Sequence, residues 1–230
     1  PFRNTYKPLA ILDLDDPLTL HSVTTCEPKQ SELVCESSVV IGPWGRVFHV
    51  SPKAVYAWTT HFRRTSLDPI PGEIASDIAA LYRLPLDGSA PSALQVEGSP
   101  VDQFSFLESA DGFLNVLVGG TGGGDNMWRA NESRGPLRLL RLPLDDFADG
   151  STVASHDSFR RLSGPREGAL LNRFIGDFLL YGSSEASKLY AVRWAKGQEM
   201  DPLLLGQRIE RIEPMGNNAL VAGNQGDNLH

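Results

Sequence analysis

A glycine-rich segment, residues 119–126, has a composition that could bind a ligand; it reads GGTGGGDN. Successive backbone N–H groups in such a segment can surround an anion. A phosphate-binding loop would also carry a Gly-Lys-Ser/Thr ending and lead into a helix, and the sequence predicts neither. We therefore expect a connector here rather than a phosphate site.

No cofactor is predicted, and calcium is the alternative that stays open because calcium prefers oxygen ligands. Asp125 and Asn126 could supply them, but their spacing is not that of a calcium-binding loop, and solvated turn residues are the favoured interpretation. Asp13, Asp15 and Asp16 could also supply oxygen ligands, but they too lack the spacing of a calcium-binding loop. The five histidines are scattered, with no pair at metal-site spacing, so no metal site is predicted from them.

The sequence contains no motif that is typical of a hydrolase. Residues 182–186 read GSSEA and lack the second glycine of a G-x-S-x-G nucleophile elbow. Carboxylates are frequent, but acid–base catalysis depends on separations across the fold that a sequence does not give. No catalytic residue is assigned, and a non-catalytic protein is favoured over a hydrolase or lyase with its site at the mouth of a central channel.

Composition narrows the class of protein. The chain has 230 residues, of which 41% are hydrophobic, enough for a substantial core. Its formal net charge of -7 leaves no basic excess for a phosphate backbone, so nucleic acid is a poor candidate partner. No apolar segment approaches the roughly 20 residues that a transmembrane helix needs.

The two cysteines, Cys26 and Cys35, flank a polar segment that contains Pro28. This composition favours a hairpin turn, and the two arms of a hairpin lie close enough for a disulfide. Two unrelated buried thiols are the alternative, and zinc is disfavoured because a second ligand pair is missing. A disulfide would place the protein in an extracellular or periplasmic compartment.

Three types of predicted strand recur in a fixed order, separated by Gly, Pro, Asn and Asp. The first type occurs at residues 46–50, 101–106, 170–175 and 209–214. The second type follows at residues 54–58, 113–118, 178–181 and 219–222. The third type occurs at residues 81–88, 139–146 and 189–194, and Pro85 and Pro143 within it predict a strand at the edge of a sheet.

A less regular fourth strand, such as residues 92–96, completes a four-stranded unit. This order predicts an all-β fold, a β-propeller of four-stranded blades that forms an incomplete ring of about four blades. A β-sandwich is the alternative. The whole chain, residues 1–230, is interpreted as one array that is part of a longer protein. Its expected units are residues 1–45, 46–98, 99–165, 166–207 and 208–230, the first and last being partial blades.

Three short segments carry a family resemblance: residues 51–60 (SPKAVYAWTT), 102–108 (DQFSFLE) and 112–116 (GFLNV). They resemble the bacterial secreted β-propeller family distantly related to WD40 repeats, in which N-Q-F-S-M-D-E precedes a G-Y-L-R-V-A-T-T strand. The sequence departs from this pattern at Asp102 in place of Asn, at residues 106–107 and at residues 118–120. The resemblance covers residues 40–120 and implies a propeller fold and an exported location, with no activity attached.

Two long loops, residues 61–78 and 119–135, follow second-type strands of adjacent units and would emerge on the same face of a propeller. Aromatic and arginine side chains on such loops are enriched at recognition sites. The predicted binding residues are Phe62, Arg63, Arg64, Met127, Trp128 and Arg129. The alternative is that Phe62 and Trp128 hold their loops against the sheet. The sequence thus predicts an exported scaffold that binds a protein or surface polymer through one loop face.

Overall fold

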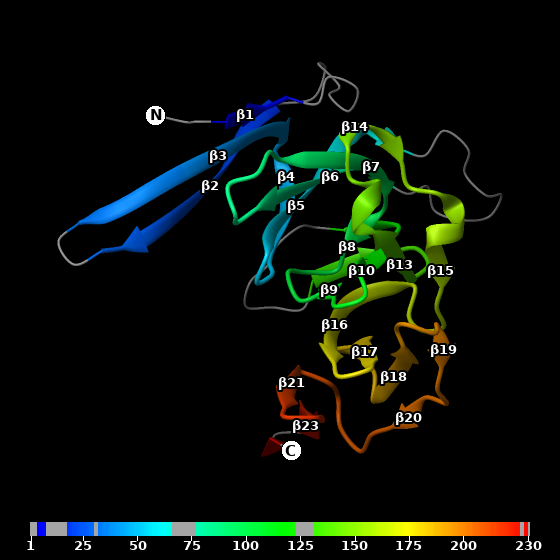
Figure 1. The fold of residues 1–230 in the computed structure, drawn as a ribbon. Helices are drawn as coiled ribbons and strands as arrows, with labels where there is room; N and C mark the ends of the chain where they lie inside the picture. The colour runs from blue at the N-terminus through cyan, green and yellow to red at the C-terminus, as the bar shows by residue number, and fades with distance from the viewer. Residues whose placement is uncertain are drawn as a thin grey trace.

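The protein is all-β in its computed structural model, which describes residues 4–7, 18–29, 32–65, 77–122, 131–225 and 228–229 (Figure 1). Besides strands, these residues form two short 3₁₀ turns, η1 (Leu144–Asp146) and η2 (His156–Ser158). In the described part of the chain, no helix has the length and apolar character that a membrane span requires.

The N-terminal sheet is dominated by a long hairpin that extends away from the rest of the molecule (Figure 1). Its strands are β1 (Asn4–Tyr6), β2 (Leu18–Pro28) and β3 (Leu33–Pro43). Cys26 lies directly opposite Cys35 and forms the predicted disulfide, with 4.1 Å between the two Cα atoms. The base of the hairpin is buried on the neighbouring sheet, where the Tyr82 hydroxyl donates to the carbonyl of Ile41 at 2.9 Å.

Three antiparallel meanders and a final hairpin follow along the chain (Figure 1). The first meander consists of β4 (Gly45–Val50), β5 (Ala54–Thr65), β6 (Asp77–Pro85) and β7 (Ser92–Glu97). On its outer edge, β14 (Asp149–Val153) pairs parallel to β7. The second meander consists of β8 (Ser99–Pro100) and β9 (Phe106–Ser109), which both pair with β10 (Phe113–Gly119), then β13 (Arg138–Pro143) and β15 (Phe159–Arg161).

The third meander consists of β16 (Glu167–Ile175), β17 (Phe178–Ser183), β18 (Lys188–Arg193) and β19 (Gln198–Glu199), with β20 (Leu203–Leu204) also on β18. Its inner edge is extended by β12 (Asn131–Arg134) and β11 (Thr121–Gly122). The final hairpin is β21 (Arg211–Met215) with β22 (Asn218–Ala222), followed by the small pair β23 (Asn224–Gln225) and β24 (Asn228–Leu229).

The prediction that third-type strands lie at a sheet edge is wrong. Strands β6, β13 and β18 each have a partner on both sides. Pro85 and Pro143 are tolerated because each is the last residue of its strand. Pro85 pairs with Ala54 of β5, whereas the pairing of β6 with β7 stops two residues earlier, at Arg83. A proline at that position removes no ladder hydrogen bond on the β7 side.

The predicted strand at residues 101–106 is also displaced. The strand begins only at Phe106, and residues 101–105 form a turn. The Asp102 side chain stabilises this turn because its Oδ1 accepts hydrogen bonds from the Phe104 backbone N–H at 2.8 Å and from the Ser105 hydroxyl at 3.1 Å. Such local bonds compete with a ladder, which explains the difference.

Each sheet packs its apolar side chains on the next sheet. One buried cluster joins the first and second meanders and includes Trp58, whose indole N–H donates to the carbonyl of Gly98 at 3.1 Å. A second cluster joins the second and third meanders, and a third joins the third meander to the final hairpin. The core is therefore a series of junctions between successive sheets.

We predict that the disulfide stabilises only the outer part of the hairpin. An exposed two-stranded ribbon is marginal in water, and a cross-link of this loop size contributes about 2–3 kcal/mol. In a Cys26→Ser/Cys35→Ser variant, amide hydrogen exchange of the paired residues 24–27 and 33–36 should accelerate, while exchange in β5 and β6 stays unchanged.

Thr24→Val is the matched control, because it keeps the β-branched shape and removes the hydroxyl contact of Thr24 with Ser37 at 2.8 Å. It should leave exchange in the hairpin nearly unchanged. Equal acceleration in the first meander of the cysteine variant would contradict the local role.

Candidate functional site

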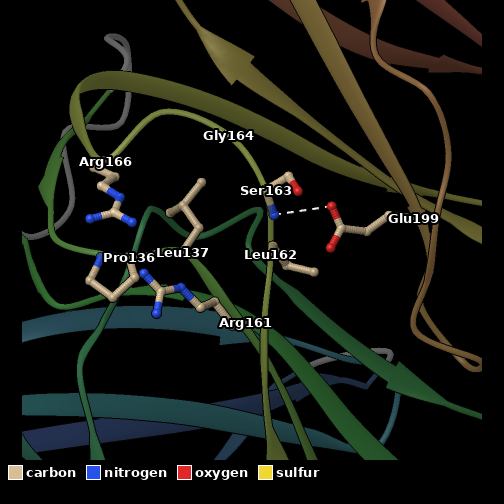
Figure 2. A pocket seen from close by; sticks show the side chains of 8 residues that line it. All are labelled: Pro136, Leu137, Arg161, Leu162, Ser163, Gly164, Arg166 and Glu199. Carbon is tan, nitrogen blue, oxygen red and sulfur yellow. Dashed lines mark hydrogen bonds between the residues drawn. The ribbon is translucent and has the colours of Figure 1, made fainter. Parts of the chain in front are cut away.

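A cavity of about 420 Å³ opens between the second and third meanders (Figure 2). Its walls come from the segment before β13, from the connector between β15 and β16 (residues 162–166), and from β19. The lining residues are Pro136, Leu137, Arg161, Leu162, Ser163, Gly164, Arg166 and Glu199.

The connector is fixed by hydrogen bonds at successive positions. The Leu162 N–H donates to the carbonyl of Leu137 at 2.9 Å, which holds the connector to the second meander. The Ser163 N–H donates to Glu199 Oε2 at 3.0 Å, and the Tyr181 hydroxyl donates to the Ser163 carbonyl at 2.7 Å. Both polar groups of the Ser163 backbone are therefore bound by the third meander.

Gly164 lets the connector approach the third meander closely. Its φ of +128° lies in a region that residues with a Cβ rarely adopt. A Cβ at this position would lie 3.1 Å from Tyr181 Cε2, and the Tyr181 ring stacks on that of Tyr190 with 5.4 Å between centroids. Burial raises the pKa of the Tyr181 hydroxyl, so it stays protonated and continues to donate to Ser163.

Two arginines extend into the cavity from opposite ends of the connector. Arg161 is the last residue of β15 and Arg166 precedes β16. Figure 2 shows both guanidinium groups on the same side of Leu137, beside Pro136. Two like charges in this arrangement attract an anion, and guanidinium groups bind carboxylate and phosphate oxygens through paired N–H donors.

Besides the two arginines, the polar residues that line the cavity are Ser163 and Glu199. Leu137 and Leu162 are buried and form the wall between the arginines and Glu199, which lies across the connector from them (Figure 2). One oxygen of Glu199 accepts the bond from Ser163, and the other is left as an acceptor for a bound molecule. The arrangement combines a cationic end, an apolar wall and an acceptor.

Sequence reasoning missed this cavity. Its residues are separated by up to 63 positions and belong to no known motif, so only the fold brings them together. One feature of the sequence could have indicated the arginines of the cavity. Residues 160–166 read RRLSGPR, a basic cluster around a Gly-Pro turn in a chain of net charge -7.

The predicted binding residues are placed only in part. Phe62, Arg63 and Arg64 belong to β5 rather than to a loop, since β5 continues to Thr65, and their side chains lie outside the described part of the structure. Met127, Trp128 and Arg129 lie outside the described residues, as do the calcium candidates Asp125 and Asn126. Among the described residues, no group of three His, Cys, Asp or Glu side chains could hold a metal ion.

A buried carboxylate links the first and second meanders. The side chain of Glu108 is 4% exposed and accepts hydrogen bonds from the hydroxyls of Ser51 and, at 2.9 Å, Tyr56. The ammonium group of Lys53 lies 3.9 Å from its Oε1. Burial raises the pKa of the Tyr56 hydroxyl, which keeps it a donor. These contacts give Glu108 a structural role at the junction of the two sheets.

Asp102 makes a similar link between the second and third meanders. Its Oδ1 accepts a hydrogen bond from Asn172 Nδ2 of β16 at 3.0 Å, in addition to the two bonds that form its own turn. Burial raises the pKa of the Asp102 carboxyl, which means that its charge is costly in this environment. All three donors converge on one oxygen, which an asparagine would also provide.

No protein-family model, curated protein or solved structure matches this chain. The geometry of the cavity and of the sheet junctions is therefore the basis for an assignment of function.

We predict that Asp102→Asn is neutral or stabilises the fold by up to about 1 kcal/mol at neutral pH, because it keeps the acceptor and removes a buried charge. The raised pKa means that the folded state binds a proton that the unfolded chain has released. The free energy of unfolding of the wild type therefore falls as the pH rises from the pKa of an unfolded aspartate through that of folded Asp102. Urea unfolding at several pH values should show the advantage of the variant growing over this interval and constant above it.

Asp102→Ala is the comparison, because it leaves the donors of Phe104, Ser105 and Asn172 without their acceptor. The free energy of unfolding of this variant should be about 1–3 kcal/mol lower than that of the wild type at neutral pH. An Asp102→Asn variant that is as unstable as Asp102→Ala would show that the charge itself is required.

Proposed function

We propose that this chain is a non-catalytic, exported β-propeller scaffold that binds a surface polymer through the cavity between its second and third meanders. The observation that carries the proposal is the pair of arginines beside Pro136, in a surface cavity whose backbone is fixed by the third meander. A cavity of this size accommodates a segment of a polymer better than a folded partner.

Contacts between successive meanders support the propeller interpretation. In a propeller, the first strands of neighbouring blades lie beside one another around a central axis. Here Asp102, in the turn before β9, bonds to Asn172 of β16, and Arg173 of β16 forms an ion pair with Glu213 of β21 at 3.3 Å. A chain of contacts between first strands fits an incomplete ring of about four blades. A two-sheet sandwich offers no reason for it.

The family resemblance is compatible with this interpretation. The position at which the secreted propeller family has Asn is occupied by Asp102, whose Oδ1 organises the turn before β9 and reaches the next meander. The disulfide between Cys26 and Cys35 supports an extracellular or periplasmic location, where such bonds persist.

The two buried carboxylates described above support a binding role over a hydrolytic one. Glu108 and Asp102 are both engaged by donors that join neighbouring sheets. A general acid or base needs a proton to exchange with a substrate, and these groups face the protein interior instead.

The test is retention on a panel of immobilised polymers, one acidic through carboxylates, one sulfated and one neutral, with the products analysed after incubation. We expect retention on an acidic polymer without release of new reducing ends or unsaturated sugars. Release of either product would show a hydrolase or lyase, and a lack of retention on every polymer would overturn the proposal.

A further inference from the structure

We infer that the polymer is a uronate-type polysaccharide, one of whose carboxylates lies between the guanidinium groups of Arg161 and Arg166. This inference rests on the proposed function and adds the chemical class of the ligand. Both arginines line the cavity, and their guanidinium groups lie on the same side of Leu137 (Figure 2). Within the described part of the chain, Arg166 forms no ion pair that an incoming anion would have to displace.

The remaining walls of the cavity match a sugar ring. Pro136 and Leu137 line the cavity next to the arginines, and both are apolar, so the C–H face of a pyranose meets no polar side chain there. Glu199 lies across the connector and offers a carboxylate oxygen to a sugar hydroxyl. A ligand with an anion at one end and hydroxyl donors at the other would therefore contact the arginines with its anion and Glu199 with a hydroxyl.

Electrostatics favours carboxylates that are widely spaced along the polymer. The chain carries a net charge of -7, and Glu199 adds a negative charge within the cavity itself. A densely sulfated or phosphorylated polymer would place several charges near this carboxylate and the acidic surface, where they are repelled. A uronate polymer carries one charge per sugar and keeps its hydroxyls, so it avoids this repulsion.

The cavity is already formed before a ligand binds. The connector is held at Leu162 by the second meander and at Ser163 by Tyr181 and Glu199. Gly164 packs on the Tyr181 ring, which fixes the chain two residues before Arg166. Because little ordering of the backbone is required, the entropic cost of binding is reduced.

The experiment is calorimetric titration of the protein with trigalacturonate and, separately, with its fully methyl-esterified form, at low ionic strength. The acid should bind and the ester should bind at least about tenfold more weakly, because the ester lacks the charge that the arginines recognise. Arg166→Gln should weaken binding of the acid by about tenfold, and Arg166→Lys should retain part of it. Arg166 is exposed, so these variants are expected to fold, and thermal unfolding checks that they do.

Arg208→Gln is the matched control, because Arg208 is an exposed arginine next to the final hairpin and lines no part of the cavity. Its affinity for trigalacturonate should equal that of the wild type. Equal affinity of Arg166→Gln, equal affinity for the ester, or tighter binding of a sulfated disaccharide would each overturn the inference. In all three cases retention on a polymer would still support the scaffold function, whereas a lack of retention on the whole polymer panel would overturn both.

Discussion

Each sheet of this protein buries apolar side chains against the following sheet, and the rest of the structure depends on this packing. Trp58 is fully buried between the first two meanders, and its indole N–H is satisfied by the Gly98 carbonyl of the same junction. Leu117 and Ile175 belong to the equivalent clusters at the next two junctions. Because every meander is covered by its neighbour, each buried cluster contains residues of two sheets. The position of each sheet is therefore set by the one before it.

Polar contacts then fix how the sheets are aligned. Glu108 is bonded across the first junction and Asp102 across the second, and both are carboxylates whose removal from water must be offset by several donors. Apolar packing tolerates sliding, whereas these hydrogen bonds require particular partners. They therefore select one alignment among the several that the apolar faces would allow.

The cavity is a consequence of the same alignment. The connector must leave the second meander at Arg161 and enter the third at Glu167, and on its way it is bonded to Tyr181 and Glu199. The two arginines lie at the ends of this short path and so face the same cavity. Two positive charges at one cavity, in a chain of net charge -7, support the proposed binding of an anion there.

Local chemistry made the strands and the disulfide predictable from the sequence. The turn residues and β-branched segments located most strands of the meanders, and the polar segment after Cys26 located a hairpin. The position of the third-type strands was not predictable, because Pro85 is compatible with an interior strand only when its neighbour β7 ends earlier, which depends on register. The cavity was missed because Leu137, Arg166 and Glu199 meet only through the packing of two sheets.

A crystal structure of the protein with trigalacturonate bound is the most direct test of this account. We predict a carboxylate within hydrogen-bonding distance of the guanidinium groups of both Arg161 and Arg166, with the bonds of Ser163 to Tyr181 and Glu199 intact. A ligand bound elsewhere on the molecule, or a connector that has left the third meander, would contradict it.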